Sequence, residues 1–127
     1  MTRLSTLQQI SVNARDLPRA VAFYRDRLGV KHLFDGGPHL SFFDCGGIRL
    51  MLSVAEKPEF DHASSILYFR VDDIGAAHRD LLKAGVAFRD APHVVARLPD
   101  REVWMAFFED SEGNLLAITS EVASAAA

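Results

Sequence analysis

Few side chains in this sequence could act as nucleophiles, general bases or metal ligands. It holds five histidines and one cysteine. His39, His62 and His93 stand far apart in or near predicted turns, which favours surface or loop-stabilising roles, with His93 as the one weak candidate for catalysis. Cys45 precedes a Gly-Gly turn and has no adjacent base that would lower its pKa, so we expect an inert thiol. A single cysteine also excludes an internal disulfide and fits a reducing, cytoplasmic setting.

The composition excludes several classes of partner. The 127 residues are 49% apolar and 24% charged, which is typical of a globular protein. A net charge of −3 argues against a nucleic-acid-binding surface, which needs a basic face. No apolar run approaches the length needed to span a membrane, and the first residues lack the apolar core of a signal peptide. We therefore expect neither nucleic acid nor membrane as a partner.

Two segments recur in the same order and indicate a duplicated module. Gly113–Thr119 resembles Gly47–Ser53, and Asp72–Ala77 resembles Arg15–Ala20. Such repeats predict two copies of one supersecondary unit. We place the first module at about residues 7–54, a linker at 55–63 and the second module at about 64–121, within one domain spanning 1–127.

Each module is expected to contain one strand, one helix and three further strands. Alternating polarity predicts the first strand of each module, and Asp16 and Asp73 can cap the helices that Gly29 and Gly85 would end. The predicted strands cover residues 7–14, 30–34, 40–44 and 48–53, then 65–71, 86–89, 102–109 and 115–120. The extra length of the second module, residues 91–101, predicts either a lid-like loop or a plain hairpin.

The two faces of four predicted strands differ in polarity. One face is apolar and must be covered, for which the two amphipathic helices are available. The opposite face is mixed and is either solvent-exposed surface or the lining of a concavity. The apolar face carries Ile10, Val12, Ile48, Leu50, Leu52, Leu67, Phe69, Val71, Leu116 and Ile118. The mixed face carries Gln9, Ser11, Asn13, Arg49, Met51, Ser53, Ile66, Tyr68, Arg70, Leu115, Ala117 and Thr119.

These features together resemble the vicinal oxygen chelate (VOC) superfamily, which includes glyoxalase I, bleomycin-resistance proteins and extradiol dioxygenases. The resemblance covers residues 7–122 and rests on 7–17, 22–24, 67–74 and 108–116. It implies an α+β fold in which two βαβββ modules form a cupped mixed sheet with helices on the outer face. The mixed face above would then line the cup, and a second subunit would complete it, so we expect a homodimer.

The resemblance also implies where a metal would bind. In the metalloenzymes of this family, each module supplies one ligand from its first strand and one from its last. The matching positions hold Gln9, Met51, Ile66 and Ala117. Only Gln9 offers an oxygen suited to the hard divalent cations these enzymes use. We therefore expect no divalent metal cofactor at this site and interpret Gln9 as a polar residue in a wet cavity.

Two classes of function follow from the resemblance. The first is a metal-free protein that binds or sequesters a small organic molecule, as bleomycin-resistance proteins do. Gln9, Arg49, Tyr68 and Arg70 would anchor the ligand and Trp104 would form a wall, with Met51, Ile66 and Ala117 beside them. Arginines on this face favour an anionic ligand because a guanidinium matches a carboxylate bidentately, and the aromatic side chains favour an aromatic one. The arginines could equally form ion pairs at the rim.

The second class is an enzyme of the glyoxalase, isomerase or dioxygenase type. It would need a displaced metal site, or metal-free acid–base chemistry by a histidine such as His93.

Overall fold

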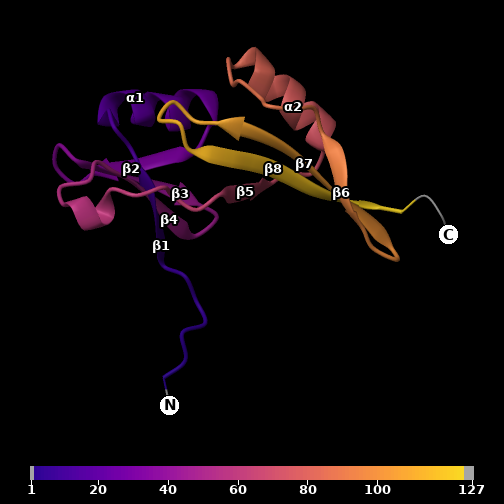
Figure 1. The fold of residues 1–127 in the computed structure, drawn as a ribbon, viewed down its shortest axis with the longest axis horizontal. Helices are drawn as coiled ribbons and strands as arrows, with labels where there is room; N and C mark the ends of the chain where they lie inside the picture. The colour runs from indigo at the N-terminus through magenta and orange to yellow at the C-terminus, as the bar shows by residue number, and fades with distance from the viewer. Residues whose placement is uncertain (1, 125–127) are drawn as a thin grey trace. The chain divides into compact units, whose positions relative to one another are not determined.

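The computed structural model describes residues 2–124 and divides the chain into two compact units between Ser65 and Ile66. Each unit contains a four-stranded mixed sheet (Figure 1). The fold is α+β and matches the two βαβββ modules expected from the sequence. Within the described residues, no helix has the length and apolar character needed to cross a membrane.

The first unit builds its sheet in the order β1-β4-β3-β2. β1 and β4 are parallel, and the remaining neighbours are antiparallel. Its elements in chain order are β1 (Gln9–Asn13), α1 (Leu17–Ala22), a π-helical turn (Phe23–Arg27), β2 (Lys31–Asp35), β3 (Leu40–Cys45), β4 (Ile48–Ser53) and a 3-10 turn (Pro58–Phe60).

The second unit repeats this topology in the order β5-β8-β7-β6. β5 and β8 are parallel, and β8, β7 and β6 are antiparallel neighbours. Its elements are β5 (Leu67–Arg70), α2 (Ile74–Lys83), β6 (His93–Arg97), β7 (Arg101–Glu109) and β8 (Leu115–Ala123).

Aspartates begin both helices. Asp16 accepts a hydrogen bond from the Arg19 amide at 3.1 Å, and Asp73 accepts one from the Ala76 amide at 3.0 Å. These bonds satisfy amides that have no partner within the helix. Gly85 follows α2 with a φ of 90°, a left-handed conformation that favours glycine.

The core of each unit lies between its sheet and its helix. α1 contacts β3 and β4, and α2 contacts β7 and β8. The covered faces carry the buried residues Val12, Phe43, Leu50 and Leu52 in the first unit, and Ala106, Phe108, Leu116 and Ile118 in the second.

Two predicted elements differ from the structure, and the structure decides between two alternatives for a third segment. The first helix turns π-helical from Phe23, where the Leu28 amide donates to the Phe23 carbonyl. Residues 86–89 form no strand, because Phe88 makes only an isolated bridge to Phe108 and the Asp90 carboxylate takes the Phe107 amide at 2.9 Å. Residues 91–101 are predicted as either a lid-like loop or a plain hairpin. The structure has the hairpin, in which β6 pairs with β7.

Candidate functional site

Each sheet has one face turned away from its helix, which we call the open face of that unit. Residues that pair across neighbouring strands point to the same side, so the register assigns the members. In the first unit the open face carries Gln9, Ser11 and Asn13 of β1, Leu40, Phe42 and Asp44 of β3, and Arg49, Met51 and Ser53 of β4.

A hydrogen-bonded group occupies the start of the first open face. The Gln9 amide nitrogen donates to the Met51 sulfur at 3.6 Å, and its oxygen accepts from Arg49 Nε at 3.0 Å. The Arg49 guanidinium lies 5.5 Å from the centre of the Phe42 ring, which stacks on Phe34 at 4.8 Å. Both ends of the Gln9 amide are therefore engaged, and Arg49 is held between an amide and an aromatic face.

The second open face is more aromatic. It carries Tyr68 and Arg70 of β5, His93 of β6, Val103, Met105 and Phe107 of β7, and Ala117, Thr119 and Glu121 of β8. Tyr68 and Phe107 both pair with Ala117, and their rings meet edge to face at 6.1 Å. Ala117 is 0% exposed, so its predicted contact with a ligand would require that these rings move.

Arg70 and Ile66 lie at opposite ends of β5. The Arg70 side chain has no hydrogen bond or ion pair within the part of the chain that the structure describes, whereas the Arg49 side chain has both an amide and an aromatic partner. Arg70 pairs with Thr119, whose hydroxyl donates to the Trp104 carbonyl at 3.1 Å. Ile66 stands immediately before β5 and is 39% exposed.

The structure corrects the expected position of Trp104. Its cross-strand partner is the buried Ser120, so the register places its side chain on the helix-covered side and not on the open face. The indole nitrogen donates to Glu102 at 3.3 Å. Met105 takes the open-face position beside Thr119, because neighbouring residues of a strand point to opposite faces.

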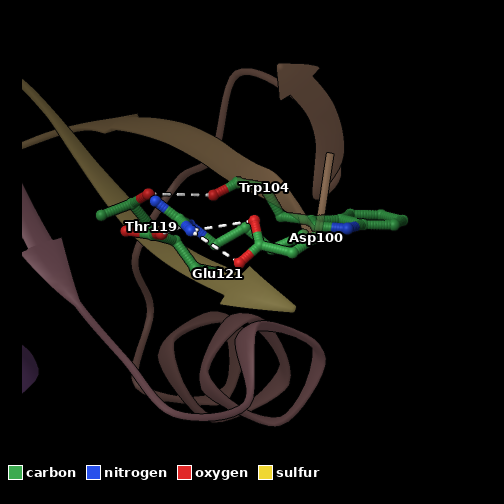
Figure 2. A network of polar contacts seen from close by, with 5 residues as sticks. Asp100, Trp104, Thr119 and Glu121 are labelled. Carbon is green, nitrogen blue, oxygen red and sulfur yellow. Dashed lines mark hydrogen bonds and ion pairs between the residues drawn. The ribbon is translucent and has the colours of Figure 1, made fainter. Parts of the chain in front are cut away.

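An ion-pair network closes the far end of this hairpin. Arg101, the first residue of β7, contacts Asp100 at 3.0 Å and also pairs with Glu121 of β8. Figure 2 shows Asp100 and Glu121. All three side chains are well exposed, so water screens the pairs and they contribute little stability.

The histidines and Cys45 form no joint site. His39 lies 4.0 Å from Glu56, His62 contacts the Ala63 carbonyl at 3.1 Å, and His93 donates from Nδ1 to the Ala91 carbonyl at 2.9 Å. Burial and the neighbouring Asp44 raise the pKa of the Cys45 thiol, which disfavours the reactive thiolate.

A polar cluster that the sequence analysis missed joins β2 and β3. Ser41 donates to Asp35 at 2.7 Å, and His32 Nε2 lies 2.9 Å from Asp35 and 3.1 Å from Ser41. The residue types suggest a catalytic triad, but a triad uses one imidazole nitrogen for the acid and the other for the serine. Here Nε2 meets both, and Ser41 is fully buried, so the cluster is structural. Its three members lie close only because a bulge shifts the β2–β3 register at residues 32–34.

The cluster predicts a pH dependence of stability. The hydrogen bonds from Ser41 and then His32 hold the pKa of Asp35 below its ordinary value of 3.8. A depressed carboxyl pKa contributes stability above the unfolded-state pKa and loses it as the pH falls through the folded-state pKa. We expect Asp35→Asn to lower the melting temperature by roughly 2 °C at pH 7. The difference from the unsubstituted protein should shrink as the pH falls below the ordinary carboxyl pKa of 3.8.

Differential scanning calorimetry from pH 2.5 to 7 measures this difference. Glu59→Gln is the matched control, because Glu59 has no hydrogen bond or ion pair among the described residues. A gap for Asp35→Asn that stayed constant with pH would contradict the assignment.

The four positions at which the family holds its metal do not fit one. Gln9 supplies the only oxygen, and Arg49 already donates to it, which places a guanidinium where a divalent cation would need open space. Met51 offers a thioether, which suits soft metals, and Ile66 and Ala117 offer no donor. Among the residues that the structure describes, no three His, Cys, Asp or Glu side chains gather as a metal site elsewhere.

The duplicated fold and these open faces define a class of protein. The model of the glyoxalase/bleomycin resistance protein/dioxygenase superfamily matches residues 6–118, and the chain belongs to this family. A curated relative, "Uncharacterized protein YraH" of Bacillus subtilis (strain 168), is 30% identical over 128 residues, covering 88% of this chain and 95% of the relative.

Solved structures share the fold at lower identity. A lactoylglutathione lyase from Agrobacterium tumefaciens has a TM-score of 0.72 at 21% identity and covers 94% of this chain and 96% of its own. The V. Pseudocholerae mobile-metagenome protein VPC_CASS1 has a TM-score of 0.76 at 20% identity, with 94% and 97% covered. Identities this low establish the fold and leave activity open.

Proposed function

We propose that this chain is a VOC-family protein that binds a small organic molecule without the family's metal, as a binding or sequestering protein does. The observation that carries the proposal is the hydrogen bond from Arg49 Nε to the Gln9 oxygen at 3.0 Å. Of the four residues at the family's ligand positions, only Gln9 has a side-chain oxygen, and that oxygen already accepts a hydrogen bond from the Arg49 guanidinium. A divalent metal bound to the same oxygen would face electrostatic repulsion from the guanidinium.

The open faces offer the features of an organic binding site. Such sites are mainly apolar, with a few polar groups that fix orientation. On the first open face, Phe42 and Met51 supply apolar surface and Gln9 and Arg49 supply polar anchors. On the second, Tyr68 and Phe107 supply apolar surface and Arg70 a polar anchor. The uncommitted guanidinium of Arg70 favours a ligand with an anionic group.

We expect protein purified without chelators to contain no stoichiometric divalent metal in elemental analysis. Added Zn²⁺, Ni²⁺ or Fe²⁺ should leave the melting temperature unchanged, because only a species that binds the folded state raises it. Arg49→Ala is the informative variant, since it frees the Gln9 oxygen. It should still bind no divalent metal, because Met51, Ile66 and Ala117 offer no oxygen or nitrogen donor. One equivalent of divalent metal bound through Gln9 would overturn the proposal and favour a metalloenzyme.

An enzyme that uses His93 is the second candidate. The hydrogen bond from Nδ1 to Ala91 leaves the other ring nitrogen as an acceptor, and the register puts His93 on the second open face beside Met105. Asp90 lies 3.7 Å from the same Nδ1. With Nδ1 held as a donor, the other ring nitrogen can accept a proton from a substrate, as a general base does. An activity towards a glyoxalase-type substrate that His93→Gln abolishes would support it.

A homodimer is part of the proposal. Open faces bearing exposed apolar residues such as Tyr68 gain from being covered, and sheet edges are commonly covered by a second copy. Multi-angle light scattering at micromolar concentration should return twice the chain mass of 14.0 kDa, and a monomer would count against it.

A further inference from the structure

A hollow of about 240 Å³ lies at the end of the first open face, where the chain leaves β4. Its floor is formed by Leu40, Met51 and Ser53 of the sheet, and its wall by the segment that follows. The wall residues are Val54, Ala55, Glu56, Lys57 and Phe60. The sequence predicts residues 55–63 only as a linker, and this hollow gives that segment a role.

Backbone hydrogen bonds hold the wall in place before any ligand arrives. The Val54 amide donates to the His39 carbonyl at 2.9 Å, and the Phe60 amide donates to the Lys57 carbonyl at 3.0 Å. Beyond the wall, the Asn13 side chain donates to the His62 carbonyl at 2.9 Å and its backbone amide donates to Ser64 Oγ at 2.8 Å. A preformed wall lowers the ordering cost of binding.

The lining is apolar and leaves an aromatic ring uncovered. Phe60 is 59% exposed although it stands at the edge of a hollow floored by Leu40 and Met51. The Met51 thioether adapts to differently shaped partners and packs well against aromatic rings. A ring seated on this floor would bury the exposed side of Phe60 and the apolar floor together.

The size of the hollow selects a small group. An apolar cavity of about 150 Å³ accommodates benzene. A hollow of about 240 Å³ therefore has room for one substituted ring.

The charges at the rim select the sign of the substituent. The Lys57 side chain has no hydrogen bond or ion pair among the described residues, and it is the one cationic side chain among the described residues that line the hollow. The neighbouring Glu56 carboxylate lies 4.0 Å from His39. The Lys57 ammonium is therefore available to an anionic group on a bound ligand. The hollow adjoins the stacked rings of Phe34 and Phe42, because Met51 pairs with Phe42.

We propose that the linker wall and the end of the first sheet form a binding subsite for a single aromatic ring that carries an anionic group. The ring would sit between Phe60 and the Leu40–Met51 floor, with its charge at Lys57. This inference rests on the proposed function and narrows it to one ligand class and one place.

The test uses fluorine NMR of the full-length protein with two probes, 4-fluorobenzoate and neutral fluorobenzene. Phe60→Ala should weaken binding of both probes about tenfold, because it removes one wall of the subsite. Lys57→Gln should weaken 4-fluorobenzoate about fivefold and leave fluorobenzene unchanged. Leu82→Ala and Lys83→Gln on α2 are the controls and should change neither affinity.

Equal binding of 4-fluorobenzoate by all variants would overturn the subsite but leave the proposed function standing, since the probe would then bind elsewhere on the chain. Absence of binding by both probes would also overturn the subsite. Failure of the proposed function is seen separately, as stoichiometric metal in the purified protein. Circular dichroism of each variant checks that lost binding does not reflect lost folding.

Discussion

Phe43→Ala is expected to lower the free energy of unfolding by about 3–5 kcal/mol, the range for removing a buried aromatic side chain. Phe43 is 0% exposed, and its ring lies 6.2 Å from that of Tyr24 and 5.1 Å from that of His32. Its removal leaves a cavity between the first sheet and α1 that the surrounding side chains fill only in part. Urea unfolding followed by circular dichroism measures the change as a lower midpoint.

Phe42→Ala is the matched control on the other face of the same strand. Phe42 stacks on Phe34 at 4.8 Å and supports Arg49 at 5.5 Å, contacts worth about 1 kcal/mol in all. We expect a small loss of stability and a weaker affinity for an aromatic anion. Equal losses of stability for the two variants would contradict the assignment of the faces.

Ala117→Glu is the second large effect, with an expected cost of about 3–5 kcal/mol at pH 7. Position 117 is where the family places a glutamate ligand, but here Ala117 is fully buried beside Tyr68 and Phe107. A carboxylate at this position would lose its hydration with no cation to replace it. The substitution therefore tests whether the packing of Tyr68 and Phe107 excludes a charged side chain from position 117.

The pH dependence distinguishes charge from size. Burial raises a carboxyl pKa, so the penalty is absent below the unfolded-state pKa of about 4.3 and grows as the pH rises towards the folded-state pKa. Ala117→Gln has nearly the same shape and no charge. In chelator-treated buffer, the melting temperatures of the two variants should be similar at pH 4 and well separated at pH 7. A gap that did not change with pH would show that position 117 is open to water.

The sequence by itself determined the plan of the two modules. Alternating polarity in β1 and β4, the aspartate caps at Asp16 and Asp73, and the repeated glycine turns are local signals, and each acts through the conformation of a few neighbouring residues. The same alternation placed Gln9 and Met51 on one face of the sheet, where the structure joins them by a hydrogen bond of 3.6 Å.

For the remaining segments, only the tertiary structure decided which face of the sheet each side chain lies on and which residues it contacts. Trp104 lies in a nine-residue strand that is apolar on both sides, so polarity could not say which way it points, and pairing with the buried Ser120 decided it. Residues 86–89 lost their predicted strand because the Asp90 side chain takes the Phe107 amide. The wall built by Lys57 and Phe60 and the cluster of His32, Asp35 and Ser41 depend on contacts between strands and loops, which no spacing in the sequence encodes.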